Sequence, residues 1–397
     1  MKSFFKDSLI NIISNMLIVL AIQLLVFPTL NKIEDKINFS NVIVMYGYIM
    51  ILSTALSNTL TNTRLITSNS LDIIKKHNVF SSLFFLISII NVIITITLLL
   101  VYKIDIFTSC GFLFFSIFIF TRFYLLVYMR EELNYMRILK VNILIFLSYL
   151  LGIYIYICLD INYSFIFVIG ELAGLVTLIR YIYFIDRKPL NFRITFDKEI
   201  YFSYINLMVI NSIINLLNYF DRIILLPIIG PMAVNVYFIA STAGKMVSLV
   251  TTPINNVILS YIAKKEIKKE MILKILIFLV VILIPLFYVI KYSSILYINI
   301  FYNNYLEQAS NIVSYVSVIC CLSLVISIVH PFTIKFIESL LLLKLQIFYC
   351  ILYVVLSLIL TPTYGLIGYC IATSIYLFVK LALTFLILLN KNKSIIR

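Results

Sequence analysis

Long apolar runs follow one another along the whole chain, separated by short polar segments. An α-helix needs about 20 mostly apolar residues to cross the hydrocarbon core of a bilayer. The runs are continuous, unlike the ten-residue alternating segments of a membrane β-barrel. We therefore predict an all-α integral membrane protein with twelve spanning helices. They cover residues 9–30, 41–61, 79–101, 107–129, 141–159, 164–184, 204–228, 234–260, 271–290, 309–329, 340–360 and 366–389.

The charges between these runs alternate in a way that sets an orientation. With the N-terminus in the cytoplasm, twenty of the 31 basic residues fall in or beside inner segments, four in outer loops and seven inside spans. An excess of lysine and arginine on the cytoplasmic side is typical of multi-pass membrane proteins. We therefore expect a multi-pass protein of the bacterial inner (plasma) membrane, with both termini cytoplasmic.

The longest inner segment divides the spans into six and six. We predict an N-terminal six-helix bundle over residues 1–185, a cytoplasmic linker loop over 186–203 and a C-terminal six-helix bundle over 204–397. An even number of spans in each half makes both halves enter from the same side, as in parallel-repeat transporters.

Composition supports this picture and removes several function classes. The chain is 63% hydrophobic and 12% charged, with a mean hydropathy of +1.10, so it has no room for a separate soluble domain. The net charge of +14 does not indicate nucleic-acid binding, because the basic residues lie in scattered short loops. We expect membrane lipids, and no nucleic acid, as partners.

Motifs for enzymes, metals and nucleotides are missing from the sequence. It has no P-loop, dinucleotide fingerprint or hydrolase motif, none of the six cysteines forms a CxxC pair, and there are only two histidines. The sequence therefore predicts a protein that is not an enzyme and has no cofactor or metal. Without an ATP site, energy for transport would come from an ion gradient, the membrane potential or substrate removal.

A polar stripe marks the span 204–228. Asn211, Asn215, Asn218 and Arg222 fall at i, i+4, i+7 and i+11, which places them on one face of a continuous helix. Polar groups at membrane depth are costly and usually face a cavity, a partner or a substrate path. We predict that this face binds substrate.

The next span, 234–260, is the second polar helix. Tyr237 and Lys245 lie close to one face, together with serine and threonine hydroxyls that in other helices often serve packing alone. An ammonium in mid-membrane costs at least ~2.5 kcal/mol on insertion scales without a partner. We therefore expect Lys245 to face a cavity and bind substrate.

Four charged residues inside spans have two interpretations each. Arg222 either binds an anionic group or pairs at the interface with Asp221, although adjacent helical residues point about 100° apart. Glu171 and Asp221 are candidate ion-coupling carboxylates, and the alternative for Glu171 is a protonated or paired structural role. Arg122 is a candidate for substrate binding, or it reaches the inner surface by snorkelling.

Two segments resemble the polysaccharide flippase family of bacteria. Residues 216–263 carry a pattern like the family's yxDRxil…G…vxxYxxa…p, and residues 361–381, TPTYGLIGYCIATSIYLFVKL, are similar to the yGxxGxaxa opening of its last helix. The matching residues are Tyr219, Asp221, Arg222, Gly230, Tyr237, Ala240 and Pro253 in the first segment and Tyr364, Gly365, Gly368 and Ala372 in the second. This family belongs to a superfamily that also holds multidrug and toxin extrusion proteins and lipid II flippases.

The resemblance implies a fold, a substrate and partners. The fold is two six-helix bundles around a central cavity. The activity is translocation of an undecaprenyl-diphosphate-linked O-antigen or other surface polysaccharide repeat unit from the cytoplasmic to the periplasmic leaflet, in lipopolysaccharide or polysaccharide biosynthesis. A polysaccharide polymerase is an expected partner, and coupling to proton or sodium entry is an open expectation.

Two rival functions remain from the sequence. One is an ion-coupled exporter of drugs or other small molecules with the same fold, for which an acidic or aromatic cavity is expected rather than basic groups. The other is a membrane polysaccharide polymerase. That class needs a sizeable catalytic outer loop, whereas the longest one here, 292–308, has a single carboxylate, Glu307.

Overall fold

The computed structural model describes residues 2–66, 73–185, 195–246, 269–337 and 339–391, apart from some side chains within these ranges. Almost all described residues are helical, and none of them forms a strand. Ten helices in these ranges are long and apolar enough to cross a membrane. One of them, Lys344–Leu388, holds the last two predicted spans, and part of the predicted span 234–260 lies outside the described ranges. The predicted all-α membrane architecture is confirmed.

The chain forms two compact units, residues 1–220 and 221–397. This division assigns the helix after the central loop to the N-terminal unit. Residues 186–194 of the predicted linker lie outside the described ranges, so the linker boundaries stay a prediction.

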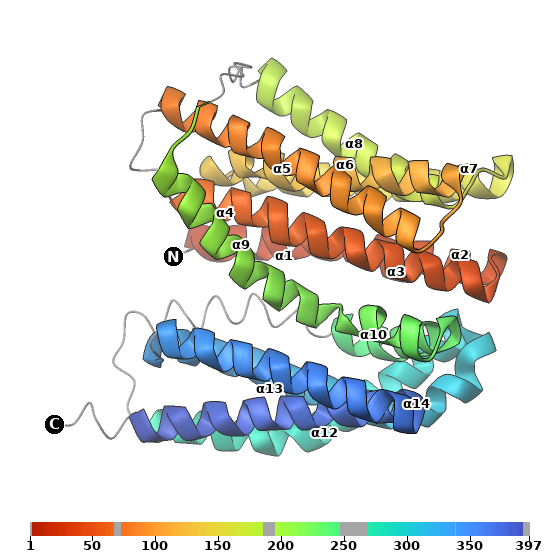
Figure 1. The fold of residues 1–397 in the computed structure, drawn as a ribbon, viewed down its shortest axis with the longest axis vertical. Coiled ribbons are helices and arrows are strands. Elements are labelled where there is room, and N and C mark those ends of the chain that lie inside the picture. The colour runs from red at the N-terminus through yellow and green to blue at the C-terminus, as the bar shows by residue number, and fades with distance from the viewer. Residues whose placement is uncertain (1, 67–72, 186–194, 247–268, 338, 392–397) are drawn as a thin grey trace. The chain divides into compact units, whose positions relative to one another are not determined.

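The N-terminal unit is a set of long helices, several of which continue through a π-helical turn (Figure 1). In chain order they are α1 (Lys2–Leu20), η1 (Ala21–Val26), α2 (Phe27–Ile33), α3 (Lys36–Leu52), η2 (Ser53–Asn58), α4 (Thr59–Ile66), α5 (Ile73–Val101), α6 (Ile106–Glu131), α7 (Tyr135–Leu159), α8 (Ser164–Ile179), η4 (Arg180–Ile185) and α9 (Lys198–Asn218).

The short polar segments between apolar runs also start the helices. The Asp35 carboxylate accepts a hydrogen bond from the backbone N–H of Asn38 at 2.7 Å, and Asp105 accepts one from Thr108 at 2.8 Å. Such caps satisfy backbone donors that the first helical turn leaves unpaired. The same loops that carry the topology signal therefore fix where α3 and α6 begin.

Glycines on α8 allow neighbouring helices to approach closely. A Cβ on Gly170 would lie 2.4 Å from the Tyr149 ring of α7, and one on Gly174 would lie 2.5 Å from Ile145 and 3.4 Å from Cδ of Arg122. Small residues at such contacts are typical of membrane helix packing. This close approach brings side chains of α6, α7 and α8 within hydrogen-bonding reach.

The C-terminal unit contains α10 (Phe220–Ile228, with Phe220 assigned to the N-terminal unit), helical residues 231–246, α12 (Lys269–Phe301), η5 (Asn303–Tyr305), α13 (Leu306–Phe336) and α14 (Ser339–Lys391). Gly365, with φ 60° and ψ −140°, interrupts α14 and separates the last two predicted spans. The predicted outer loop 292–308 is mostly helical, because α12 runs to Phe301 and α13 starts at Leu306. This leaves no sizeable loop there for a polymerase site.

The predicted helix over residues 204–228 is interrupted just before Asp221 and Arg222. The span 204–228 breaks at Tyr219, where φ is −116° and ψ is 15°, so α9 ends at Asn218 and α10 starts at Phe220. The i+11 spacing that placed Arg222 on the face of Asn211 and Asn215 assumed a continuous helix, so that shared face stays a prediction.

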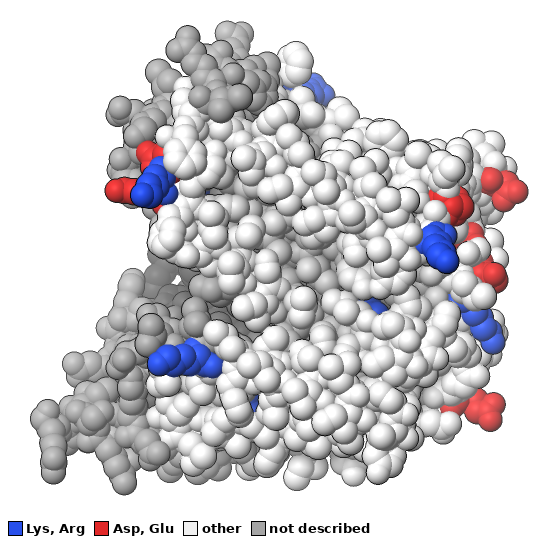
Figure 2. All heavy atoms as spheres, viewed as in Figure 1, with Lys and Arg blue, Asp and Glu red and all other residues white. Residues whose placement is uncertain are grey.

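Charged side chains are sparse on the face of the protein shown in Figure 2. On the face shown in Figure 2, most lysine, arginine, aspartate and glutamate side chains lie near the ends of helices, with uncharged surface between them. This distribution is the one that a bilayer imposes on the surface it covers.

Candidate functional site

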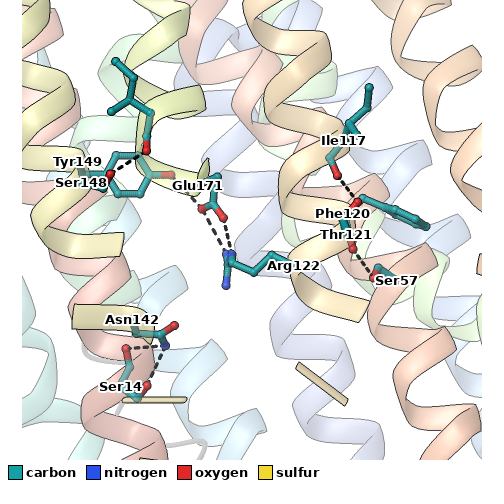
Figure 3. A network of polar contacts seen from close by, with 11 residues as sticks. Ser14, Ser57, Ile117, Phe120, Thr121, Arg122, Asn142, Ser148, Tyr149 and Glu171 are labelled. Atoms are coloured by element: carbon teal, nitrogen blue, oxygen red, sulfur yellow. Dashed lines mark hydrogen bonds and ion pairs between the residues drawn. The ribbon is translucent and has the colours of Figure 1, made fainter. Parts of the chain in front are cut away.

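Arg122 of α6 and Glu171 of α8 form a buried ion pair in the N-terminal unit (Figure 3). Arg122 donates from Nε to Glu171 Oε2 and from Nη2 to Oε1 at 3.3 Å, and Tyr149 donates its hydroxyl to Oε1 at 3.1 Å. The two side chains are 3% and 0% exposed. The structure therefore brings together two residues that the sequence analysis treated separately.

The pairing favours the interpretation of Glu171 as a paired structural residue. Arg122 does not snorkel to a surface, because its guanidinium is buried against the carboxylate. Side chains on a helix lean toward its N-terminus. The Arg122 side chain therefore extends toward the start of α6, where it meets Glu171 of α8. Glu171 already accepts three hydrogen bonds, so an ion would have to compete with Arg122 and Tyr149 for it.

Arg64 is a second buried arginine, and it is not among the site residues predicted from the sequence. It donates from Nε to Glu131 Oε1 at 3.1 Å and from Nη1 to the Tyr124 hydroxyl at 3.1 Å. Its guanidinium carbon lies 4.2 Å from the Tyr128 ring centre. One feature of the sequence could have indicated this pair: Arg64 and Glu131 lie just beyond two predicted spans that end on the same side of the membrane.

The asparagines of α9 contact their own unit. Asn211 donates to Thr59 Oγ1 at 2.8 Å, and Asn215 donates to the Asn211 carbonyl at 2.8 Å. Tyr204 donates to the Leu56 carbonyl at 3.2 Å. The Asn218 side chain lies outside the described part of the structure. Asn211 of the predicted stripe therefore helps to pack α9 against α4, and the role of the stripe in substrate binding stays a prediction.

The C-terminal unit has its own ion pair, between Asp221 and Lys245. Lys245 Nζ lies 3.1 Å from Asp221 Oδ2. The lysine side chain is 46% exposed while the aspartate is only 6% exposed. Asp221 Oδ1 is buried and has no hydrogen-bond partner among the described residues. The pair is therefore open on the ammonium side and enclosed on the carboxylate side.

Local backbone structure explains how these two residues meet. The break at Tyr219 places Asp221 in the first turn of α10, where the helix dipole favours a negative charge. Gly230, with φ 112°, then reverses the chain into the next helix. A residue with a side chain rarely adopts that backbone conformation. Lys245 leans back toward the start of its helix and so reaches the level of Asp221.

Arg222 points elsewhere. It is 4% exposed, and its guanidinium carbon lies 5.4 Å from the centre of the Phe238 ring. The expected divergence of adjacent helical residues accounts for this, since Asp221 turns toward Lys245 instead. Within the described residues, the interpretation of Asp221 and Arg222 as an ion pair is not supported.

Tyrosines surround the Asp221–Lys245 pair on one side. Lys245 Nζ lies 5.8 Å from the Tyr237 ring centre, and that ring meets Tyr369 edge-on at 5.0 Å between centres. The hydroxyls of Tyr369 and Tyr353 are 2.5 Å apart, and Thr373 donates to Tyr353 at 3.3 Å. The predicted site residue Tyr237 thus belongs to a tyrosine cluster, formed by Tyr237, Tyr353 and Tyr369, that the sequence analysis did not find.

Among the described residues, no group of three or more histidine, cysteine or acidic side chains is placed to hold a metal ion. The arrangement of the site instead offers an ammonium, a buried carboxylate and aromatic hydroxyls. Such groups suit binding of a charged organic molecule and exchange of a small cation, rather than covalent chemistry.

No protein-family model and no curated protein sequence matches this chain. Solved structures do resemble it over nearly its full length. The lipid II flippase MurJ in an inward closed conformation aligns with a TM-score of 0.71 at 14% identity, covering 98% of this chain and 86% of MurJ. This chain has the fold of the MurJ flippase. An inward-facing multidrug resistance MATE family transporter of the MOP superfamily aligns with a TM-score of 0.66 at 12% identity, covering 97% and 99%.

A third resemblance concerns a MOP superfamily transporter from Pyrococcus furiosus, described by the reverse polarity of its binding pocket. Its TM-score is 0.61 at 16% identity, and the alignment covers 98% of this chain and 95% of that one. The predicted likeness to the superfamily is confirmed at the level of fold. The closer likeness to polysaccharide flippases stays a prediction.

Proposed function

We propose that this protein is a flippase that moves an undecaprenyl-diphosphate-linked repeat unit of O-antigen or another surface polysaccharide across the bacterial inner membrane by alternating access. Both termini are cytoplasmic in this proposal, and a polysaccharide polymerase uses the product in the outer leaflet. The observation that carries the proposal is the Asp221–Lys245 pair, with its half-exposed ammonium inside an otherwise apolar chain.

The exposure of Lys245 fits an anionic substrate. Nearly half of this side chain remains accessible, so a ligand from outside the pair can reach it. A diphosphate offers more negative charge than one carboxylate and competes well for the same ammonium. Asp221 then holds Lys245 in place between transport cycles.

Competition at Lys245 also supplies a route for ion coupling. When a diphosphate takes the ammonium, Asp221 loses its counter-charge while remaining buried. A buried, unpaired carboxylate is costly and recovers stability by taking up a proton or a sodium ion. Binding of the anion therefore favours binding of a cation at Asp221, without any contact between the two ligands.

The tyrosine cluster supports Lys245 from its buried side. Tyr237, Tyr353 and Tyr369 are 4%, 3% and 1% exposed, and the Tyr237 ring centre lies 5.8 Å from Lys245 Nζ. An aromatic ring near an ammonium stabilises its charge, so the cluster helps to keep Lys245 charged for an anionic substrate. The lipid tail stays in the bilayer, and only the hydrophilic head needs these polar groups.

The test is a strain that lacks this protein, complemented with variants. Loss of surface polysaccharide on gels, with complete lipid-linked repeat units trapped on the inner leaflet by mass spectrometry, is the expected result for the deletion and for Lys245→Ala. The matched control is Lys291→Ala, which removes a lysine that lies over Phe287 in α12. Normal polysaccharide in Lys245→Ala at wild-type protein levels contradicts the proposal.

A second candidate is an ion-coupled exporter of organic cations. The observation that favours it is the buried carboxylate of Asp221 beside aromatic rings, a combination that binds cations. Resistance of the same deletion strain to cationic dyes distinguishes the two. Increased dye sensitivity with unchanged polysaccharide supports the exporter and contradicts the flippase.

A further inference from the structure

A separate polar pocket lies in the C-terminal unit, where α13 ends and where α14 both starts and ends. Its lining includes His330 of α13, Gln346 and Tyr349 of the first half of α14, and Lys380 and Thr384 of the second half. His330 is the last residue of an apolar span, and Lys380 precedes the end of another span at Leu388 by about 12 Å at ~1.5 Å per residue. The pocket therefore extends from headgroup depth into the hydrocarbon layer.

Lys380 supplies the charge of this pocket. Its Nζ lies 3.5 Å from the Tyr376 hydroxyl and 5.7 Å and 5.8 Å from the ring centres of Tyr349 and Tyr376. Within the described residues Lys380 makes no ion pair, and no acidic side chain lines the pocket. Aromatic rings stabilise an ammonium only in part, so an anion is the ligand that this charge still requires.

The other lining groups fit a phosphate in an apolar setting. His330 and Gln346 carry N–H groups that can donate to phosphate oxygens, while Ile326 and Leu345 provide apolar walls. Beside Gln346 on the same helix, Ile347, Phe348 and Ile351 are exposed. This apolar surface suits acyl chains that continue from a headgroup in the pocket.

We propose that this pocket binds the phosphate headgroup of a membrane phospholipid, with Lys380 as its counter-charge. The site is separate from the Asp221–Lys245 pair and does not depend on which substrate the protein transports. The acyl surface beside the pocket favours a lipid over free phosphate. A bound phospholipid here would hold the end of α13 against both halves of α14.

The test uses the purified full-length protein in an uncharged detergent. Phosphatidylglycerol is added, and thermal unfolding and native mass spectrometry report binding. Diacylglycerol with the same chains and inorganic phosphate are the parallel probes. The expected result is a rise in the unfolding temperature, with retained lipid, for phosphatidylglycerol alone. An equal rise with diacylglycerol or with inorganic phosphate overturns the proposal.

Variants assign the effect to the pocket. Lys380→Gln should weaken phosphatidylglycerol binding by about tenfold or more, the loss expected for one charge-assisted hydrogen bond. Lys380→Arg should keep it, and so should the control Lys291→Gln, which changes a lysine over an aromatic ring outside the pocket. If Lys380→Gln does not fold, His330→Ala at the exposed mouth provides the comparison, because it removes an N–H donor and should weaken binding too. Wild-type binding in the Lys380→Gln or His330→Ala protein overturns the proposal.

Discussion

Asp221 pairs with Lys245 of the following helix, not with Arg222 beside it in the sequence. The break at Tyr219 and the left-handed Gly230 make this pairing possible, because they start a new helix at Asp221 and then return the chain toward it. Within the C-terminal unit, the pair therefore joins α10 to the helical residues 231–246.

The first prediction concerns the charge at position 245. Lys245→Met keeps a long, flexible side chain and removes its charge, so transport of an anionic substrate should fall by about tenfold or more, the equivalent of one lost charge-assisted hydrogen bond. Lys245→Arg should retain much of the activity, since guanidinium also binds phosphate. Surface polysaccharide per copy of the protein is the measurement. Equal activity in the methionine and arginine variants would show that the charge is not used.

The second prediction concerns the buried pair of the N-terminal unit. Glu171→Gln leaves the Arg122 guanidinium buried without a counter-charge and should lower the free energy of unfolding by about 3–5 kcal/mol. Thermal or denaturant unfolding of the purified protein measures this change. Glu132→Gln removes an ion pair with Arg137 whose side chains are 34% and 27% exposed, and should cost about 1 kcal/mol or less.

The double variant Arg122→Met/Glu171→Leu separates structure from function. Replacing both charges with apolar residues should recover most of the lost stability, because neither charge remains uncompensated. If Glu171 only holds helices together, this variant transports normally. A stable double variant that fails to transport would mean that Glu171 takes part in ion coupling after all.

The sequence predicted the spans of this protein better than its contacts. Apolar runs of bilayer length have few alternatives to helix, so α6, α7 and α8 appear close to where hydropathy placed them. The pairing of Arg122 with Glu171 depends on which helices are neighbours and on glycines such as Gly174 that let them approach. The hydrophobic periodicity of one helix indicates neither its neighbours nor how closely they approach.

The break at Tyr219 is a second feature that the sequence did not predict. Residues 204–228 contain no proline or glycine before Pro227, so local sequence gave no reason to end a helix at Asn218. The predicted stripe from Asn211 to Arg222 assumed a continuous helix without this break. The tyrosine cluster was also missed, because Tyr237, Tyr353 and Tyr369 are far apart in the chain and each resembles an ordinary apolar position.

The third prediction tests the close approach of α7 and α8. Gly170→Ala adds a Cβ that would lie 2.4 Å from the Tyr149 ring, so the ring must move away from Glu171. We expect a loss of about 1–3 kcal/mol in the free energy of unfolding, as for other overpacked contacts. Leu172→Ala on the same helix is the control, since that side chain is exposed. A loss no greater than that of the control would mean that the helices separate without cost.

The last prediction exchanges the charges of the Asp221–Lys245 pair. Asp221→Lys and Lys245→Asp should each reduce stability, because each single change places two like charges in contact. The double exchange restores opposite charges and should recover part of the stability, measured by thermal unfolding in detergent. It also moves the cation from the accessible position to the buried one, since position 221 is enclosed and position 245 is half exposed. A phosphate then meets an exposed carboxylate that repels it, so transport should stay lost although the protein folds. Recovery of both stability and transport would show that only the ion pair matters, and that the exposed ammonium does not bind the substrate.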